Sequence, residues 1–144
     1  MLRPVGTRTI RWAVAVAMAA ALTAGCSSTK KAAPPPPCKR AHPGQYQGTG
    51  AALSDADAGG TYCVTVGQTL SITLHVAPND TGPPWQPAIS ADKTVLTPTR
   101  DPAAAAPARA TATFFVVRKA GVVAITAGRT GPPLFKVTVV AQAQ

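Results

Sequence analysis

Residues 69–76 read Thr-Leu-Ser-Ile-Thr-Leu-His-Val and carry the clearest secondary-structure pattern in the chain. Apolar side chains occupy every second position from Leu70 to Val76, and serine, threonine and histidine lie between them. Successive side chains of a β-strand point to opposite faces, so this alternation predicts one buried face and one face in water. The rest of the chain must supply further strands that cover the apolar face.

Similar short runs, rich in β-branched and aromatic residues, lie on both sides of this stretch. Turn residues separate them at a spacing of about ten residues, and no helical periodicity intervenes. The predicted strands are residues 62–66, 69–76, 88–96, 111–118, 121–127 and 134–140. This pattern is typical of an all-β, immunoglobulin-like antiparallel β-sandwich of six to seven strands, which we assign to residues 61–144.

Residues 1–25 have the form of a secretory leader. Residues 1–12 are basic, and residues 13–24 form an apolar run that would span about 18 Å as a helix. That length is too short for a bilayer core of about 30 Å, so a helical signal peptide is favoured over a membrane anchor. The leader could be a plain signal peptide, with Cys26 as an ordinary thiol, or a lipoprotein signal peptide, with Cys26 as the site of lipid attachment.

Residues 26–60 are rich in Pro, Lys, Ala and Gly and show no repeating apolar pattern. The four prolines at 34–37 favour polyproline II, a stiff spacer. We therefore predict a disordered Pro-rich tail that continues as an irregular lead-in over residues 41–60.

The composition argues against an enzyme and against a nucleic-acid-binding protein. The chain has five acidic residues, all Asp, and two histidines, His42 and His75, and no Gly-x-Ser-x-Gly motif holds a nucleophile. The net charge is +9, but the basic residues of the predicted domain are scattered singly rather than grouped with aromatics. A copper site from the histidines and Cys63 would lack the usual Met, because both methionines lie in the leader. We expect no catalytic residues, no metal and no cofactor.

The segment Leu22-Thr23-Ala24-Gly25-Cys26 resembles the lipobox of bacterial lipoproteins, with Thr23 where that family most often has Leu. The resemblance implies that the Cys26 thiol receives a diacylglyceryl group. Two or three acyl chains hold a protein on a membrane essentially permanently. We therefore expect a monomeric lipoprotein anchored on the extracytoplasmic face of the cell membrane.

With Cys26 assigned to lipid, Cys38 and Cys63 remain as an even pair in an oxidising compartment. A disulfide between them would close a loop of about 25 residues and contribute around 3 kcal/mol by the chain-entropy estimate. A metal site or a redox dithiol is the alternative, but the chain has no Cys-x-x-Cys spacing. The sequence favours the disulfide.

Three groups of residues carry a family resemblance. They are Val64-x-Val66-Gly67-Gln68-Thr69-Leu70-x-Ile72-x-Leu74, then Trp85, Ser90, Asp92 and Val95-Leu96, and finally Ala120-Gly121-x-x-x-Ile125-Thr126. Over residues 61–141 the chain resembles the Ig-like domain of small secreted actinobacterial lipoproteins, a group without an assigned activity. The resemblance implies a non-enzymatic binding or structural domain whose partner is another envelope protein.

Two loops carry a more distant resemblance. Thr81-Gly82-x-x-Trp85 matches the end of the Asn-Pro-Thr-Thr-Gly-x-x-Trp loop of chagasin-type inhibitors of papain-like cysteine proteases, and Arg129 lies where their Arg-Pro-Trp loop begins. The resemblance implies a sandwich that blocks a protease cleft with its loops. The candidate partner-binding residues are Asn79, Thr81, Gly82, Trp85 and Arg129.

The chain also departs from that family. Asp80 replaces a threonine, Thr130-Gly131-Pro132 replaces Pro-Trp, and no Gly-x-x-Gly occurs between Pro98 and Thr111. We therefore take the membrane-anchored Ig-like module as the main interpretation and the protease inhibitor as the alternative.

Trp85 lies in a loop, residues 78–87, that four prolines stiffen. The indole could be an exposed anchor for a partner or could fold onto the core. We favour the core, because aromatic residues provide so much of the burial in a small sandwich. In an immunoglobulin-like topology this loop and residues 129–133 should emerge at the same end.

Overall fold

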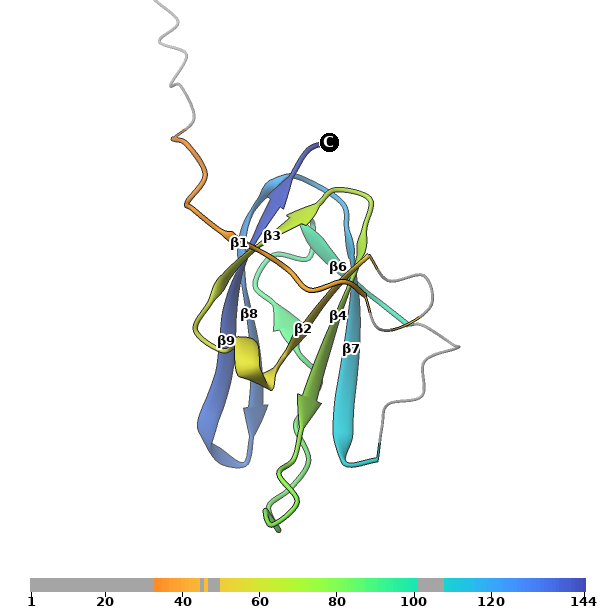
Figure 1. Cartoon of the computed structure of the whole chain (residues 1–144), viewed down its shortest axis with the longest axis vertical. Coiled ribbons are helices and arrows are strands. Elements are labelled where there is room, and N and C mark those ends of the chain that lie inside the picture. The colour runs from red at the N-terminus through yellow and green to blue at the C-terminus, as the bar shows by residue number, and fades with distance from the viewer. Residues whose placement is uncertain (1–32, 45, 47–49, 101–107) are drawn as a thin grey trace, which may run out of the picture. The chain divides into compact units, whose positions relative to one another are not determined.

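The computed structural model describes residues 33–44, 46, 50–100 and 108–144, and within them nine strands form two sheets (Figure 1). A 3-10 turn, η1 (Asp55–Asp57), follows the second strand. In this part of the chain we find no helix with the length and apolarity needed to cross a bilayer. The strands are β1 (Lys39–Arg40), β2 (Ala51–Ser54), β3 (Thr61–Thr65), β4 (Thr69–His75), β5 (Ile89–Ser90), β6 (Leu96–Thr99), β7 (Ala110–Val117), β8 (Gly121–Arg129) and β9 (Gly131–Gln142).

The two sheets confirm the predicted β-sandwich but differ from it in strand direction. One sheet has the order β1-β3-β9-β8-β5 and the other the order β2-β4-β7-β6. Both are mixed, because β1 with β3, β3 with β9 and β2 with β4 pair in parallel. The β-sandwich is therefore confirmed, but the described residues form nine strands with three parallel pairs where we expected an antiparallel arrangement of six to seven strands. Parallel pairs join strands that no tight turn connects, so a pattern of local turns does not reveal them.

Strand β4 has its predicted apolar face, and its other face is covered as well. Leu70, Ile72 and Leu74 are buried between the sheets, with Leu70 opposite Phe115 of β7. Ser71 and Thr73, which we expected in water, are buried too. The Ser71 hydroxyl donates to the Ala51 carbonyl over 3.3 Å, and Thr73 Oγ1 lies 3.3 Å from the Tyr46 hydroxyl. The outer face of this sheet is thus covered by the chain that precedes β3.

This covering segment corrects the predicted irregular lead-in over residues 41–60. Strand β2 pairs with β4 in parallel, with Ala51 opposite Leu70, and η1 follows it. Residues 33–144 form one compact unit. The sequence gives no alternation here because Ala51, Ala52 and Leu53 are all buried. Residues 51–57 therefore belong to the sandwich and not to a linker.

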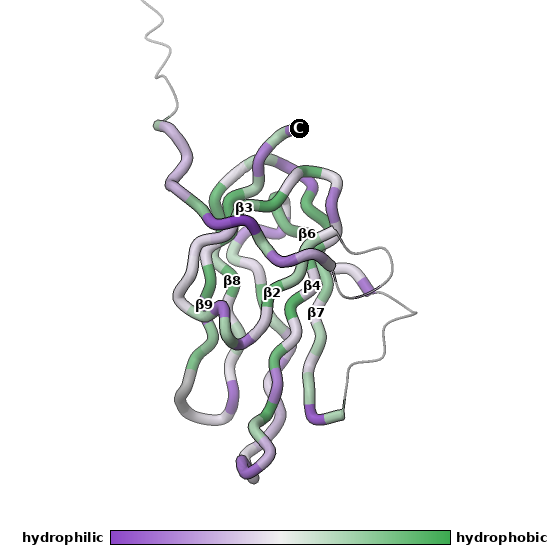
Figure 2. Tube along the Cα trace, in the orientation of Figure 1, coloured by the Kyte–Doolittle hydropathy of each residue, from purple (hydrophilic) through white to green (hydrophobic). Residues whose placement is uncertain are grey.

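The core lies between the sheets and includes Trp85. Its fully buried large side chains are Phe115, Leu70, Ile72, Leu74, Leu96, Ile125, Val117, Val137 and Val139. Figure 2 shows hydrophobic residues recurring along the strands and hydrophilic residues at the tip of the loop that follows β4. A sandwich of this size thus has one continuous core, and its loops are free to vary.

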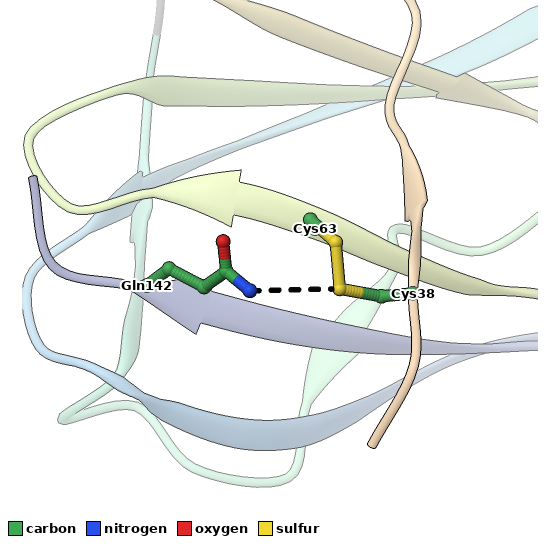
Figure 3. Close-up of a disulfide and its surroundings, with 3 residues drawn as sticks. All are labelled: Cys38, Cys63 and Gln142. Carbon is green, nitrogen blue, oxygen red and sulfur yellow. Dashed lines mark hydrogen bonds between the residues drawn. A yellow bond between two sulfur atoms is a disulfide. The ribbon is translucent and has the colours of Figure 1, made fainter. Parts of the chain in front are cut away.

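A disulfide joins Cys38 to Cys63, as predicted (Figure 3). The two Cα atoms are 5.3 Å apart across 25 residues of chain. Strand β1 lies beside β3 with Lys39 opposite Tyr62, and Gln142 Nε2 lies 3.8 Å from the Cys38 sulfur. The bond therefore attaches the N-terminal segment to the edge of one sheet.

Three regions of the predicted organisation lie outside the described residues. They are the leader at residues 1–25, Cys26, which we expect to carry the lipid, with the start of the tail, and residues 101–107. The signal peptide and the lipid anchor stay predictions.

Candidate functional site

Three connections meet at one end of the sandwich, which we call the loop end. They are the long β4–β5 loop, residues 76–88, the turn at 108–109 that precedes β7, and the β8–β9 turn (Figure 1). His75 at the end of β4 pairs with Ala110 at the start of β7, so the first two connections are neighbours. The contacts that the Arg129 side chain makes with the β4–β5 loop place the β8–β9 turn beside that loop. The expectation that both predicted loops emerge together is confirmed.

The β4–β5 loop is folded back on itself by short-range hydrogen bonds. The Asp80 backbone N–H donates to the Ala77 carbonyl over 3.0 Å, and the Gly82 N–H donates to Asp80 Oδ1 over 2.7 Å. An aspartate that accepts a bond from the residue two positions on forms an Asx-turn, a common stable loop unit. Glycine at 82 leaves room for Arg129, because a Cβ there would lie 2.6 Å from Arg129 Nη2 and would displace that side chain. The local sequence therefore fixes the bend at Gly82.

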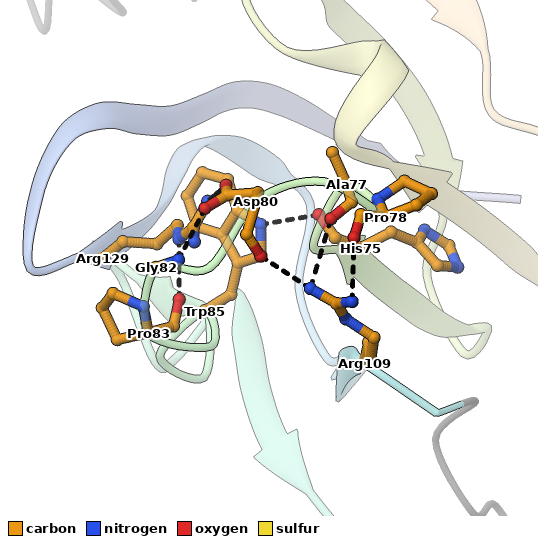
Figure 4. Close-up of polar contacts among 9 residues, drawn as sticks. All are labelled: His75, Ala77, Pro78, Asp80, Gly82, Pro83, Trp85, Arg109 and Arg129. Carbon is orange, nitrogen blue, oxygen red and sulfur yellow. Dashed lines mark hydrogen bonds and ion pairs between the residues drawn. The ribbon is translucent and has the colours of Figure 1, made fainter.

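Arg129, at the end of β8, holds this loop from one side (Figure 4). Its Nη1 donates to Asp80 Oδ2 over 2.5 Å, and its Nε donates to the Pro83 carbonyl over 2.8 Å. The guanidinium lies 5.5 Å from the centroid of the Trp85 ring, within cation–π range. The Arg129 side chain is only 10% exposed. The sequence placed Arg129 correctly beside the loop, but its charge is used inside the loop and is not displayed.

The ion pair changes the acidity of Asp80. The hydrogen bond from Arg129, followed by that from the Gly82 N–H, lowers the pKa of the Asp80 carboxyl from 3.8 to about 2. The same hydrogen bond raises the pKa of Arg129. Asp80 is therefore charged at all ordinary pH values, and the pair stays formed.

Arg109 holds the loop from the other side, a role that the sequence analysis did not predict. Its Nη1 donates to the Pro78 carbonyl over 3.0 Å, and its Nη2 donates to the Asp80 carbonyl over 2.6 Å and to that of Ala77 over 3.3 Å (Figure 4). Arg109 has a positive φ of 62°. It reaches across about thirty residues of sequence to three carbonyls, and a single basic residue in a turn carries no pattern that predicts this.

Trp85 is part of the core, as we favoured, and not an exposed anchor. Its side chain is 8% exposed, and its indole Nε1 donates to the His75 carbonyl over 3.0 Å. The Thr111 hydroxyl donates to the Trp85 carbonyl over 2.7 Å, so the end of the loop is also bound to β7. Trp85 can support the loop, but its ring is not available to a partner.

The surface left to a partner is a short crest of small residues. Asn79 and residues 81–84 are exposed, whereas Asp80 is half-buried. Of the five candidate residues, the crest therefore contains Asn79, Thr81 and Gly82. It has no nucleophile paired with a base and no free charge, so its chemistry is that of a shape with backbone hydrogen-bonding groups.

The second predicted loop, residues 129–133, is not a loop. Strand β8 continues to Arg129 and β9 begins at Gly131, which pairs with Arg129 across the hairpin. Gly131 takes a φ of +90°, which lets the chain reverse around Thr130. Prolines at 132 and 133 suggested irregular structure. Strand β9 is central in its sheet, but it pairs with β3 only from Thr138 onward, so its first residues have an open side where proline is tolerated.

Each of the two histidines faces an aspartate of η1, and His75 lies where β4 meets the loop end. His42 Nε2 lies 3.2 Å from Asp57 Oδ1, and His75 Nδ1 lies 3.0 Å from Asp55 Oδ1. Burial opposes ionisation of Asp57, but hydrogen bonds from Ser54 and Tyr62 outweigh it and lower the pKa of its carboxyl. Among the described residues no group of three or more His, Cys, Asp or Glu side chains is arranged to hold a metal ion.

Comparison with known proteins gives similarity of fold only. No protein-family model and no curated protein matches the chain. Among solved structures it is similar to the cysteine protease inhibitor EhICP2 from Entamoeba histolytica, at 18% identity and a TM-score of 0.49, over 63% of this chain and 93% of that one. It is also similar to amebosin, at 16% identity and a TM-score of 0.45, over 63% of this chain and 96% of that one. At this level of similarity we base the proposal below on the residues of the loop end.

Proposed function

We propose that this chain is a membrane-anchored, non-enzymatic β-sandwich protein that inhibits papain-like cysteine proteases with its loop end. The observation that carries the proposal is the crest held by Arg109, Arg129 and the buried Trp85. A loop that is ordered before its partner arrives loses little conformational entropy on binding. The crest is also exposed, narrow and free of charge, as a segment that enters a cleft must be.

The sequence of the crest supports this partner class over others. Thr81-Gly82-x-x-Trp85 resembles the loop of chagasin-type inhibitors, and the contacts explain the departure at position 80. Asp80 stands where that family has a threonine, and its carboxylate binds the Arg129 side chain. The change at 80 is therefore part of the scaffold that holds the crest, and the exposed Thr81 and Gly82 that follow it match the motif.

The N-terminal sequence supports the anchor. A lipidated Cys26 and the stiff prolines at 34–37 would present the sandwich outside the membrane, where secreted proteases act. The disulfide also fits an oxidising, extracytoplasmic location.

The test is inhibition of papain by the purified, lipidated chain in detergent micelles. We expect competitive inhibition with an inhibition constant in the micromolar range or below. Thr81→Lys places a long charged side chain on the crest and should weaken inhibition at least roughly tenfold. Thr99→Lys makes the same change at an exposed threonine of β6 and should leave inhibition unchanged.

A second candidate function is binding to another envelope protein without inhibition. The tight turn at residues 129–131 favours it, because this turn offers a partner much less surface than a loop would. If the wild-type chain does not inhibit papain at one hundred times the protease concentration, the inhibitor proposal is wrong and this second function remains.

A further inference from the structure

The basic side chains are used differently at the two ends of the sandwich. At the loop end, Arg109 donates to backbone carbonyls, including that of Asp80. Arg129 donates to the Pro83 carbonyl and to the Asp80 carboxylate. We call the opposite end, where β3, β7 and β9 finish and β8 begins, the tether end. It carries five exposed basic side chains, Lys39, Arg40, Lys93, Arg118 and Lys119, and one acidic side chain, Asp92.

Backbone contacts bring these residues to one surface. The Arg118 N–H donates to the Val95 carbonyl over 2.8 Å, which joins the β7–β8 turn to the connection that holds Lys93. The β3–β4 turn lies against the end of β7, since the Gly67 N–H donates to the Val117 carbonyl over 2.8 Å. Arg40 lines a cavity of about 520 Å³ together with Gln68 of that turn and Gln142 of β9.

The excess of positive charge at this end is not neutralised within the described part of the chain. The described residues form three ion pairs, and each of them involves His42, His75 or Arg129 and none of the five cations. Only Asp92 faces the five cations, and it attracts Lys119. Exposed cations left without partners on one face are complementary to an anionic surface.

We propose that the tether end docks on an anionic lipid surface, so that the loop end points away from the membrane. This inference rests on the lipid anchor of the proposed function. Residues 33–38 leave the sandwich at the tether end (Figure 1), and the disulfide holds that exit point in place. A lipidated Cys26, only twelve residues before Cys38, would keep these cations close to the headgroups. Anionic headgroups attract basic clusters within about one Debye length.

The experiment is lysine footprinting of the full lipidated chain on vesicles. The chain is reconstituted into vesicles of phosphatidylcholine alone or with one-third phosphatidylglycerol, treated with an amine-reactive acetylating reagent and mapped by mass spectrometry. We expect the acetylation rates of Lys39, Lys93 and Lys119 to be at least roughly threefold lower on the anionic vesicles than on phosphatidylcholine alone. Half-molar salt should remove this difference. Lys136 of β9 is exposed but lies away from the tether end, so it is the internal control and should react equally on both.

Two results would overturn the inference, and they are distinguishable. If the chain does not sediment with phosphatidylcholine vesicles, it has no lipid anchor, and the orientation fails together with that part of the proposed function. If it sediments but all four lysines react equally on both kinds of vesicle, the anchor stands and the docking is wrong. Lys93→Gln with Lys119→Gln should abolish the protection of Lys39, whereas Lys136→Gln should not. Protease inhibition is measured separately and does not depend on this outcome.

Discussion

Asp80 is the residue of the loop end to which both Arg109 and Arg129 bind. Its Oδ1 accepts from the Gly82 N–H, its Oδ2 accepts from Arg129, and its backbone carbonyl accepts from Arg109. Both clamping arginines therefore act on one residue. Because Asp80 is at the base of the crest and not on it, loss of its charge should loosen the loop without removing a contact surface.

The lowered pKa of Asp80 makes this role measurable. Its pKa of about 2 in the folded chain lies below the ordinary unfolded value of about 3.9, so the ion pair stabilises the folded chain above about pH 4. That contribution is lost as pH falls from about 4 toward about 2. We expect Asp80→Asn to lower the melting temperature at pH 6. The difference in melting temperature between the variant and the wild-type chain should disappear by about pH 2.

Arg129→Gln is the matched control for this experiment. It removes the other half of the pair together with the Arg129 contacts to Pro83 and Trp85, so the double variant with Asp80→Asn should melt close to Arg129→Gln alone at pH 6. A gap that keeps its full size at pH 2 would show that Asp80 acts through something other than its charge.

At the level of single elements, the sequence predicts strands where apolar and polar residues alternate and fails where they do not. Residues 69–76 alternate, and β4 occupies nearly the same range. Strand β2 has the sequence Ala-Ala-Leu-Ser, and its first three residues are buried, so the alternation that would identify it is missing. The same element hides Ser71 and Thr73, whose polarity suggested exposure. Their burial is possible because each has a hydrogen-bonding partner in the segment that covers them.

The candidate site was predictable to a similar extent. Prolines and Gly82 identify the β4–β5 loop, and the shortage of aromatic residues predicts a buried Trp85. The clamp was not predictable, because Arg109 and Asp80 meet only when β4 and β7 pair. In the sequence Asp80 is a departure from a family motif, and only the contact with Arg129 gives the departure a physical reason.

The disulfide is the element-scale feature with the largest expected effect on stability. It attaches a segment that has only a two-residue strand, β1, paired to β3. Cys38→Ser with Cys63→Ser should lower the free energy of unfolding by about 2–4 kcal/mol in urea titration. The loss should appear as a lower midpoint, and reduction of the wild-type chain should reproduce it. Recovery of both cysteines as free thiols from freshly isolated protein would contradict the bond itself.

At the scale of the whole molecule, the two ends have different chemistry. The loop end uses its two arginines to order a neutral crest, and the tether end keeps its five cations exposed. The described chain enters at the tether end, so an anchor placed before it would separate the two ends along the membrane normal. This arrangement is useful only if the chain is in fact lipid-anchored, which makes Cys26 the residue on which the whole-molecule proposal depends.

Replacement of Cys26 by Ala tests that dependence directly. The apolar run at residues 13–24 ends at Ala24-Gly25-Cys26, so the variant should either remain as an uncleaved precursor or leave the membrane fraction. The wild-type chain should partition into the detergent phase of a phase separation, because two or three acyl chains dominate its affinity for lipid. Cys38→Ser with Cys63→Ser is the control for loss of a thiol and should stay in the membrane fraction. If Cys26→Ala fractionates and migrates like wild type, the anchor is wrong, and the docking of the tether end on a membrane, which rests on the anchor, is wrong with it.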